Sequence, residues 1–236
     1  MKNRRLRNHL TTAGLVLGCI LLAVFFATQI RAVVRTTGQG VLDTQPCILI
    51  DPGHGGTDGG ASGSDGTLEK DINLSISRPL ADMLRLFGYR VEMTRDTDRS
   101  IHDDNLKTIK DQKISDMKNR LKLYNQSRLT ISIHENQFPQ TQYSGTQIFY
   151  STNDADSLAL ATSVRESVLR LLQPDNTREL KKATKDIYLL HNAKTPAILV
   201  ECGFLSNAEE LAKLKDPIYQ QNMAYAIACG VLDFDS

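Results

Sequence analysis

Short apolar runs alternate with longer stretches of mixed polarity from residue 46 to the C-terminus. Six runs are rich in aliphatic or aromatic residues and predict strands: 47–53, 89–95, 129–136, 145–151, 186–190 and 196–204. Three longer stretches predict helices: 69–88, 113–127 and 154–172. The first of these helices has apolar residues at three- and four-residue spacing, which is typical of a helix with one buried face.

Start signals predict two further helices near the end of the chain. Asn207 with Glu210 makes a capping box, and Asp216 before Pro217 supplies a cap and a proline in the first turn. Strands separated by helices over this length predict the α/β class. We therefore expect a single domain at 46–236, with a mostly parallel, twisted sheet flanked by helices on both faces.

The segment 1–35 differs from the rest of the chain. Four basic residues within the first seven positions precede a run, 10–30, that contains no charge. A run of this length can cross a hydrocarbon core of about 30 Å as a helix, and it also fits the apolar part of a secretory signal. We expect an N-terminal transmembrane anchor or signal helix, with the uncleaved anchor favoured, followed by a linker at 36–45. The basic head predicts that the body lies outside the cytoplasm.

Charge and cysteine content exclude two classes of protein. The chain has 28 Lys and Arg against 27 Asp and Glu, but six of the basic residues and none of the acidic ones lie in 1–35. The body therefore carries 22 against 27, a net charge of −5, which argues against binding nucleic acid. Its cysteines, Cys47, Cys202 and Cys229, have no paired spacing. We expect free thiols rather than a disulfide framework or a zinc ribbon.

Polar residues end or follow predicted strands that are otherwise apolar. His54 follows the first strand in the turn GHGGTDGG, His134 ends the third, and Glu201 follows AILV in the last. In an open sheet the ligand crevice lies beyond the carboxyl ends of the strands, so we expect these side chains to meet there. Glu69 opens the first helix only 15 residues after His54, close enough to fold back over the same crevice.

These residue types can form a catalytic metal site. Two histidines and one carboxylate are the ligand set of an open zinc site that keeps water in its fourth position, and a further glutamate can act as general base. The glycines around His54 allow a sharp turn and a close approach of substrate. Histidines at strand ends are often structural, so spacing alone leaves both interpretations open.

Four motifs occur in order in the body: DPGHGGTDGG, EKD, SIHEN and PAILVECGFLSN. Together they resemble the zinc-dependent N-acetylmuramoyl-L-alanine amidase family, which removes stem peptides from peptidoglycan. The resemblance implies that His54, Glu69 and His134 bind zinc and that Glu201 is the catalytic carboxylate. Within the family, the basic head, compact body and extended loop at 96–112 are most similar to the germination-specific cortex amidases of spore formers.

The resemblance also implies a reaction and its surroundings. The enzyme would hydrolyse the amide between the lactyl group of N-acetylmuramic acid and L-alanine, as a step towards the muramic lactam of spore cortex. The alternatives are a zinc hydrolase of another wall bond, such as a peptidase or deacetylase, and an anchored wall-binding protein with a dormant site. We expect a peptidoglycan substrate, membrane contact through 1–35, and an accessory activator protein outside the membrane that docks on the loop 96–112.

Some positions depart from the family's usual form or offer other chemistry. Glu135, Gln137 and Cys202 differ from the common residues, and we expect them at the rim of the site, where they would affect substrate preference. Cys202 follows Glu201 in the same strand, so its side chain should point to the opposite face and is a poor fourth ligand. His102 lies in an acidic loop that is more typical of a solvated surface than of a second metal site. His191 could touch substrate, although a structural or surface position explains it at least as well. The basic residues Arg178, Lys181, Lys182 and Lys185 could meet carboxylates of the stem peptide, although a run of charges between elements is usually a solvated surface.

Overall fold

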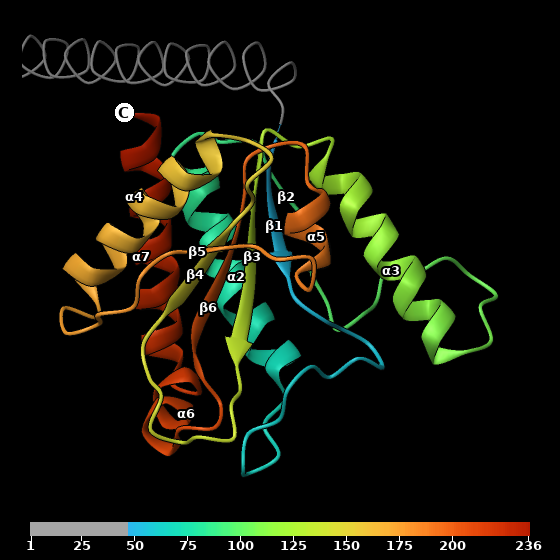
Figure 1. The fold of residues 1–236 in the computed structure, drawn as a ribbon, viewed down its shortest axis with the longest axis horizontal. Coiled ribbons are helices and arrows are strands. Elements are labelled where there is room, and N and C mark those ends of the chain that lie inside the picture. Colours follow the sequence, from blue (N-terminus) through green and yellow to red (C-terminus); the bar gives the residue numbers. More distant parts are fainter. Residues whose placement is uncertain (1–46) are drawn as a thin grey trace, which may run out of the picture. The chain divides into compact units, whose positions relative to one another are not determined.

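Figure 1 shows the computed structural model, which describes residues 47–236. The expected anchor or signal helix at 1–35 and the linker at 36–45 lie outside these residues. Within 47–236, no helix is both long and apolar enough to span a lipid bilayer. The described residues lie within the body that the sequence predicts at 46–236.

A six-stranded sheet forms the centre of the body, in the strand order β2-β1-β3-β6-β4-β5 (Figure 1). Its strands are β1 (Ile48–Pro52), β2 (Val91–Met93), β3 (Leu129–Asn136), β4 (Gln147–Tyr150), β5 (Lys181–Lys182) and β6 (Ala197–Phe204). Neighbouring strands are parallel except β4 and β6, which are antiparallel. The prediction of a mostly parallel sheet is confirmed, and the antiparallel pair makes the sheet mixed.

Helices cover both faces of this sheet, as the alternation of elements predicts (Figure 1). One face carries α2 (Glu69–Leu86), α4 (Asp156–Leu171), α6 (Ala208–Leu214) and α7 (Pro217–Asp235), whose apolar residues form the larger core. The other face carries α3 (Ile109–Tyr124) and α5 (Tyr188–Asn192) over a smaller core. The sheet is covered on both sides, so its central strands are buried on both faces, and on the smaller-core face they also bury polar side chains such as Asp51, Thr130 and Ser132.

Alternation along β3 assigns its side chains to the two faces. Leu129, Ile131 and Ile133 belong to the larger core, as predicted. Thr130, Ser132 and His134 alternate with these residues. They therefore lie on the opposite face of the sheet, which α3 and α5 cover. The register partner of His134 is Glu201 in β6, which therefore shares this face. The carboxyl ends of β1, β3 and β6 lie at one edge of the sheet, because these strands are parallel.

The structure corrects two of the predicted elements. The run 186–190 is not a strand, because Tyr188–Asn192 forms the short helix α5, in which Leu189 and Leu190 are buried. Short apolar runs fit a buried helical turn as well as a strand. The helix α3 begins at Ile109, four residues before its predicted start, because the Thr108 hydroxyl caps it by accepting a 3.0 Å hydrogen bond from the Asp111 amide. The predicted docking loop therefore ends in the first turn of a helix.

Both predicted caps near the C-terminus are present, one of them in modified form. The Asn207 side chain accepts hydrogen bonds from the amides of Glu209 and Glu210, and Asp216 accepts one from Ile218. Glu210 does not complete the capping box. Its carboxylate instead accepts hydrogen bonds from the amides of Gly145 and Phe204, each at 2.9 Å, and so joins α6 to the ends of β4 and β6.

Candidate active site

The chain leaves β1 through a backbone conformation that is unusual for a histidine. His54 has a φ of 61°, and Gly55 and Gly56 that follow have φ of 133° and 60°. A non-glycine residue in the left-handed region is strained unless its surroundings hold it there. The turn directs the His54 side chain toward the start of α2, where Glu69 lies.

Two buried arginines hold this turn in place. Arg120 donates hydrogen bonds to the carbonyl oxygens of Pro52 and His54 at 3.0 and 2.7 Å. Arg95 donates to the carbonyl oxygens of Pro52 and Gly53 at 3.0 and 2.9 Å. Asp51, fully buried, pairs with Arg120. The sequence analysis did not identify these supporting residues, because a lone arginine in a helix or after a strand carries no local signal of burial.

The structure brings His54, Glu69 and His134 together. The two oxygens of Glu69 lie between the imidazoles, with Oε2 at 3.2 Å from Nε2 of His54 and Oε1 at 2.8 Å from Nδ1 of His134. The ring centroids are 5.0 Å apart. One donor atom from each residue lies within 4.8 Å of the others, so the group can hold a metal ion. Among residues 47–236 this is the only cluster of His, Cys, Asp and Glu with that property.

Two glycines allow these side chains to meet. A Cβ atom on Gly60 would lie 2.5 Å from Oε2 of Glu69 and 2.7 Å from a ring carbon of His54. A Cβ atom on Gly53 would lie 2.7 Å from Nδ1 of His134, and nearer still to two other ring atoms. All of these distances are shorter than real Cβ atoms show. The glycine-rich turn therefore serves the close approach of backbone to the clustered side chains.

Hydrogen bonds set the charge and orientation of His54. Its Nδ1 lies 3.0 Å from Oδ2 of Asp58, which in turn pairs with Lys113 at 2.9 Å. Burial lowers the pKa of His54, but the hydrogen bonds to Asp58 and Glu69 outweigh this effect and raise the pKa to about 9. Burial likewise raises the pKa of Glu69, and the bonds to His134 and His54 bring it well below its usual value. Asp58 fixes Nδ1 as the donor, which leaves Nε2 facing Glu69.

Glu201 lies at the same edge of the sheet but outside the clustered group. It is the register partner of His134 on β3 and of Gln147 on β4. Its Oε2 is buried without a hydrogen-bond partner among residues 47–236. Burial raises the pKa of the Glu201 carboxyl to about 7, against the lowering effect of His134. A carboxyl with this pKa can accept and return a proton near neutral pH.

The expectation that the family departures lie at the rim is wrong for two of the three positions. Glu135 and Cys202 are 3% and 0% exposed, because alternation along β3 and β6 turns them into the interior, away from His134 and Glu201. Burial, together with nearby Glu201, raises the pKa of Glu135 well above its usual value. Only Gln137 is exposed, and its side-chain amide donates to the carbonyl oxygen of Ser62.

The other candidates lie apart from the clustered group. In the acidic loop, the imidazole of His102 lies 2.8 Å from the backbone oxygen of Asp103, and Asp98 pairs with Lys70. His191 is exposed on α5. Within the described residues Cys47, Cys202 and Cys229 are free thiols, as predicted.

Similarity to known proteins is consistent with this geometry. Residues 48–233 match the family described as N-acetylmuramoyl-L-alanine amidase. A relative from Bacillus subtilis, the germination-specific N-acetylmuramoyl-L-alanine amidase, is 35% identical over 231 residues, which cover 97% of this chain and 96% of the relative.

Solved structures show the same relationship. The CwlD amidase from Clostridioides difficile, solved in complex with the GerS lipoprotein, is 38% identical with a TM-score of 0.76, covering 80% of this chain and 98% of that one. The amidase AmiC2 of Nostoc punctiforme is 31% identical with a TM-score of 0.65, covering 80% and 96%. This chain belongs to the N-acetylmuramoyl-L-alanine amidase family, and it is an enzyme of that activity.

Proposed function

We propose that this chain is a zinc-dependent amidase that cuts the bond between N-acetylmuramic acid and L-alanine of peptidoglycan outside the cytoplasm. The observation that carries the proposal is the meeting of His54, Glu69 and His134 at one point, with Glu201 beside them at the carboxyl edge of the sheet. Two imidazole nitrogens and one carboxylate are the donor set of open zinc sites, so the residues present fit this metal.

Each residue then has one task in the reaction. His54, Glu69 and His134 would hold the zinc, which when bound would supply a Lewis acid for the substrate carbonyl and lower the pKa of a bound water to about 7. Glu201 takes a proton from the water that attacks the carbonyl carbon, and passes it to the L-alanine nitrogen as the carbon–nitrogen bond breaks. The products are the lactyl carboxylate and the free amine of the stem peptide. Asp58 keeps His54 in the tautomer that offers Nε2 to the metal.

Exchange of each glutamate for glutamine tests these roles. Glu201→Gln keeps shape but cannot take the proton, so it should fold, keep its zinc and lose at least about 100-fold in turnover, since general-base catalysis contributes about 10²- to 10⁴-fold. Glu69→Gln removes the charge of a ligand and should instead weaken zinc binding. Zinc analysis and turnover of a muramoyl peptide measure both. If Glu201→Gln lost its zinc while Glu69→Gln kept it, Glu201 would be the ligand and Glu69 the general base.

We further propose that the substrate is spore cortex and that the product leads to muramic lactam. Support comes from the Bacillus subtilis relative, whose name marks it as germination-specific. Mass spectrometry of muropeptides from cortex treated with the full chain tests this. Free stem peptides that begin with L-alanine are the expected product. Cleavage within the peptide, or loss of acetyl groups alone, would favour the alternative peptidase or deacetylase.

An accessory protein outside the membrane is the proposed partner, and the segment 1–35 the proposed membrane contact. One relative was solved with a lipoprotein. In this chain Lys113, near the start of α3, is 55% exposed and contacts Asp58, which contacts His54. A protein that docks on 96–112 and α3 would therefore act two contacts away from a metal ligand. Equal zinc content and equal cortex turnover with and without extract of the sporulating cells would refute this partner.

A further inference from the structure

Three aromatic rings and one arginine gather at the carboxyl end of β6, the strand that carries Glu201. Phe138, Tyr143 and Phe204 have centroids 5.7 to 6.2 Å apart. The guanidinium carbon of Arg178 lies 4.4 Å from the centroid of Phe204 and 5.6 Å from that of Tyr143. Phe204 is fully buried, whereas Phe138 and Tyr143 are 42% and 41% exposed. The cluster is therefore anchored in the fold and open to solvent on one side.

A bulge in β6 turns this cluster toward the catalytic face. His134 pairs with Glu201 and Asn136 pairs with Phe204, so β6 uses one residue more than β3 between the two pairs. The extra residue reverses the alternation of side chains along β6. Phe204 therefore lies on the same face as Glu201, although Phe204 follows Glu201 by three positions, an odd number, and regular alternation would put the two on opposite faces.

The distance between the two sites suits a stem peptide. Because of the bulge, Glu201 and Phe204 are separated by the length of two residues of β3, which is about 7 Å. Arg178, which stacks on Phe204, therefore lies roughly that far or a little farther beyond Glu201 toward the loops. An extended peptide covers about 3.3–3.6 Å per residue. A peptide that begins at the cut bond beside Glu201 would reach Arg178 within about its first three residues.

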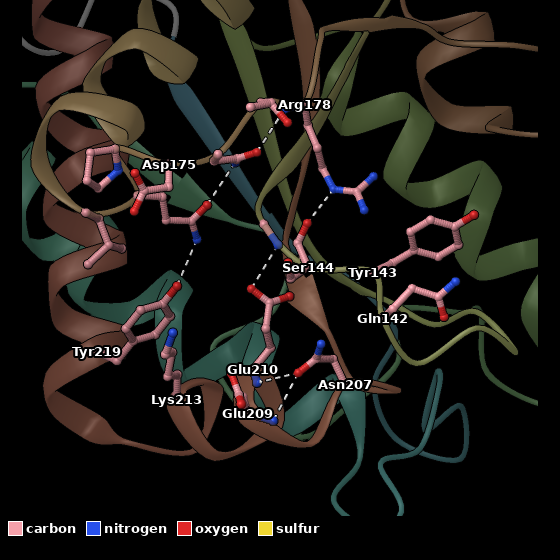
Figure 2. A pocket seen from close by; sticks show the side chains of 16 residues that line it. Gln142, Tyr143, Ser144, Asp175, Arg178, Asn207, Glu209, Glu210, Lys213 and Tyr219 are labelled. Atoms are coloured by element: carbon pink, nitrogen blue, oxygen red, sulfur yellow. Dashed lines mark hydrogen bonds between the residues drawn. The ribbon is translucent and has the colours of Figure 1, made fainter.

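The Arg178 guanidinium is fixed but not neutralised. Its Nε donates a 2.6 Å hydrogen bond to the carbonyl oxygen of Ser144, which fixes the plane of the group. Figure 2 shows the two terminal nitrogens directed away from this bond, on the side where Tyr143 lies. Within residues 47–236 neither terminal nitrogen donates a hydrogen bond, and no carboxylate forms an ion pair with Arg178. A planar guanidinium held in this way offers a paired donor to one carboxylate.

A hollow of about 1030 Å³ adjoins the same side chain, and Tyr143, Ser144 and Arg178 form part of its wall (Figure 2). Glu210 also lines the hollow, but its carboxylate already accepts hydrogen bonds from the backbone amides of Gly145 and Phe204, and these bonds fix the wall at this point. The rest of its wall comes mainly from the segment just after α4, from α6 and from the start of α7, so the hollow opens beside the guanidinium on the side of these helices.

We propose that Arg178, stacked on Phe204 and Tyr143, binds a free carboxylate of the stem peptide and makes the enzyme selective for peptides that carry it. The inference rests on the proposed function, since it takes the peptide to start at Glu201. Arg178 is a binding residue and takes no part in the bond cleavage. The paired hydrogen bonds of a guanidinium to a carboxylate discriminate against an amide, which presents one acceptor oxygen and no negative charge.

The test compares two forms of one ligand with matched variants. Wild type, Arg178→Gln, Arg178→Lys and the control Arg85→Gln are each measured with N-acetylmuramoyl tripeptide, with its peptide carboxylates either free or amidated. Arg85 is, like Arg178, a partly exposed arginine, but it pairs with Asp82 and lies in the last turn of α2, far from Glu69 in the first turn. Calorimetric binding of the released tripeptide, free or amidated, is measured in parallel, because it needs no turnover.

The expected result is a loss of about 10- to 100-fold in kcat/KM and in peptide affinity for Arg178→Gln with the free acid, mostly through KM. The amidated form should lose little, Arg178→Lys should keep part of the preference, and Arg85→Gln should match wild type. Equal losses on both forms would give Arg178 a structural role only and overturn the proposal, as would a wild type that binds both forms equally. The comparison of the free and the amidated form on wild type can overturn the proposal even if Arg178→Gln fails to fold. A wild type that binds the acid selectively but cuts neither form would refute the proposed function and leave this inference standing.

Discussion

Gly53→Ala is the sharpest single test of how the turn after β1 serves the metal ligands. Gly53 does not have a positive φ, so alanine can adopt its backbone conformation without strain. The added methyl group would meet the ring of His134, with Nδ1 at 2.7 Å and two other ring atoms nearer. The substitution therefore acts on one ligand and leaves the other two in place.

The size of the effect follows from these distances. Ordinary contact begins at 3.4 Å, so the imidazole must withdraw by more than 0.7 Å. Metal–ligand distances tolerate only about 0.2 Å. Loss of the hydrogen-bond partner that orients a metal ligand lowers the metal affinity about 10- to 100-fold. Displacement of the ligand itself should lower the zinc affinity by at least about 100-fold. Overpacking should also lower the free energy of unfolding by about 1–3 kcal/mol.

The assay is zinc affinity by competition with a chelator, together with turnover and urea unfolding. Gly59→Ala is the matched control, because Gly59 lies in the same loop without a positive φ and its Cβ would meet only the flexible end of Leu68 at 3.3 Å. The control should keep wild-type zinc affinity. A folded Gly53→Ala variant that binds zinc as tightly as wild type would refute the claim that this glycine is required by the ligand geometry.

Further variants test the ligands and their support. His54→Ala and His134→Ala should each lose most of the zinc found by metal analysis, and full occupancy in both would contradict the assignment. Asp58→Asn should weaken zinc binding about 10- to 100-fold in the same competition assay, because Asp58 orients His54. Arg120→Met leaves the buried Asp51 without its cation and should lower the free energy of urea unfolding by about 3–5 kcal/mol. Burial raises the pKa of Asp51, but Arg120 lowers it further, below its usual value. As the pH falls, the Asp51 carboxyl therefore binds a proton in the unfolded state before it does so in the folded state. The free energy of unfolding of the wild type should decrease below about pH 4, and urea unfolding at a series of pH values across that range measures this decrease.

Much of the fold and the location of the candidate site follow from the sequence. Apolar runs and amphipathic spacing are local properties, so β1, β3, β6 and α2 lie close to where the sequence predicts them. Parallel strands bring their carboxyl ends to one edge, and this rule alone predicts that His54, His134 and Glu201 gather there. Asp58 could also have been found, since it lies four residues after His54 in the same turn.

Other features depend on contacts that only the tertiary structure creates. Arg120 is buried because Asp51, 69 residues earlier in the chain, neutralises it, and no local pattern marks such a partner. The bulge that turns Phe204 toward the catalytic face arises from the pairing of β6 with β3. Glu135 looks like a surface residue in sequence, yet the pleat of β3 directs it inward once His134 faces the crevice. Local sequence patterns were enough to predict most of the elements and the types of the reactive side chains, but they missed β5 and gave α5 as a strand. The packing of distant segments decided which charges are buried and which side chains share a face, because burial depends on neighbours that are far apart along the chain.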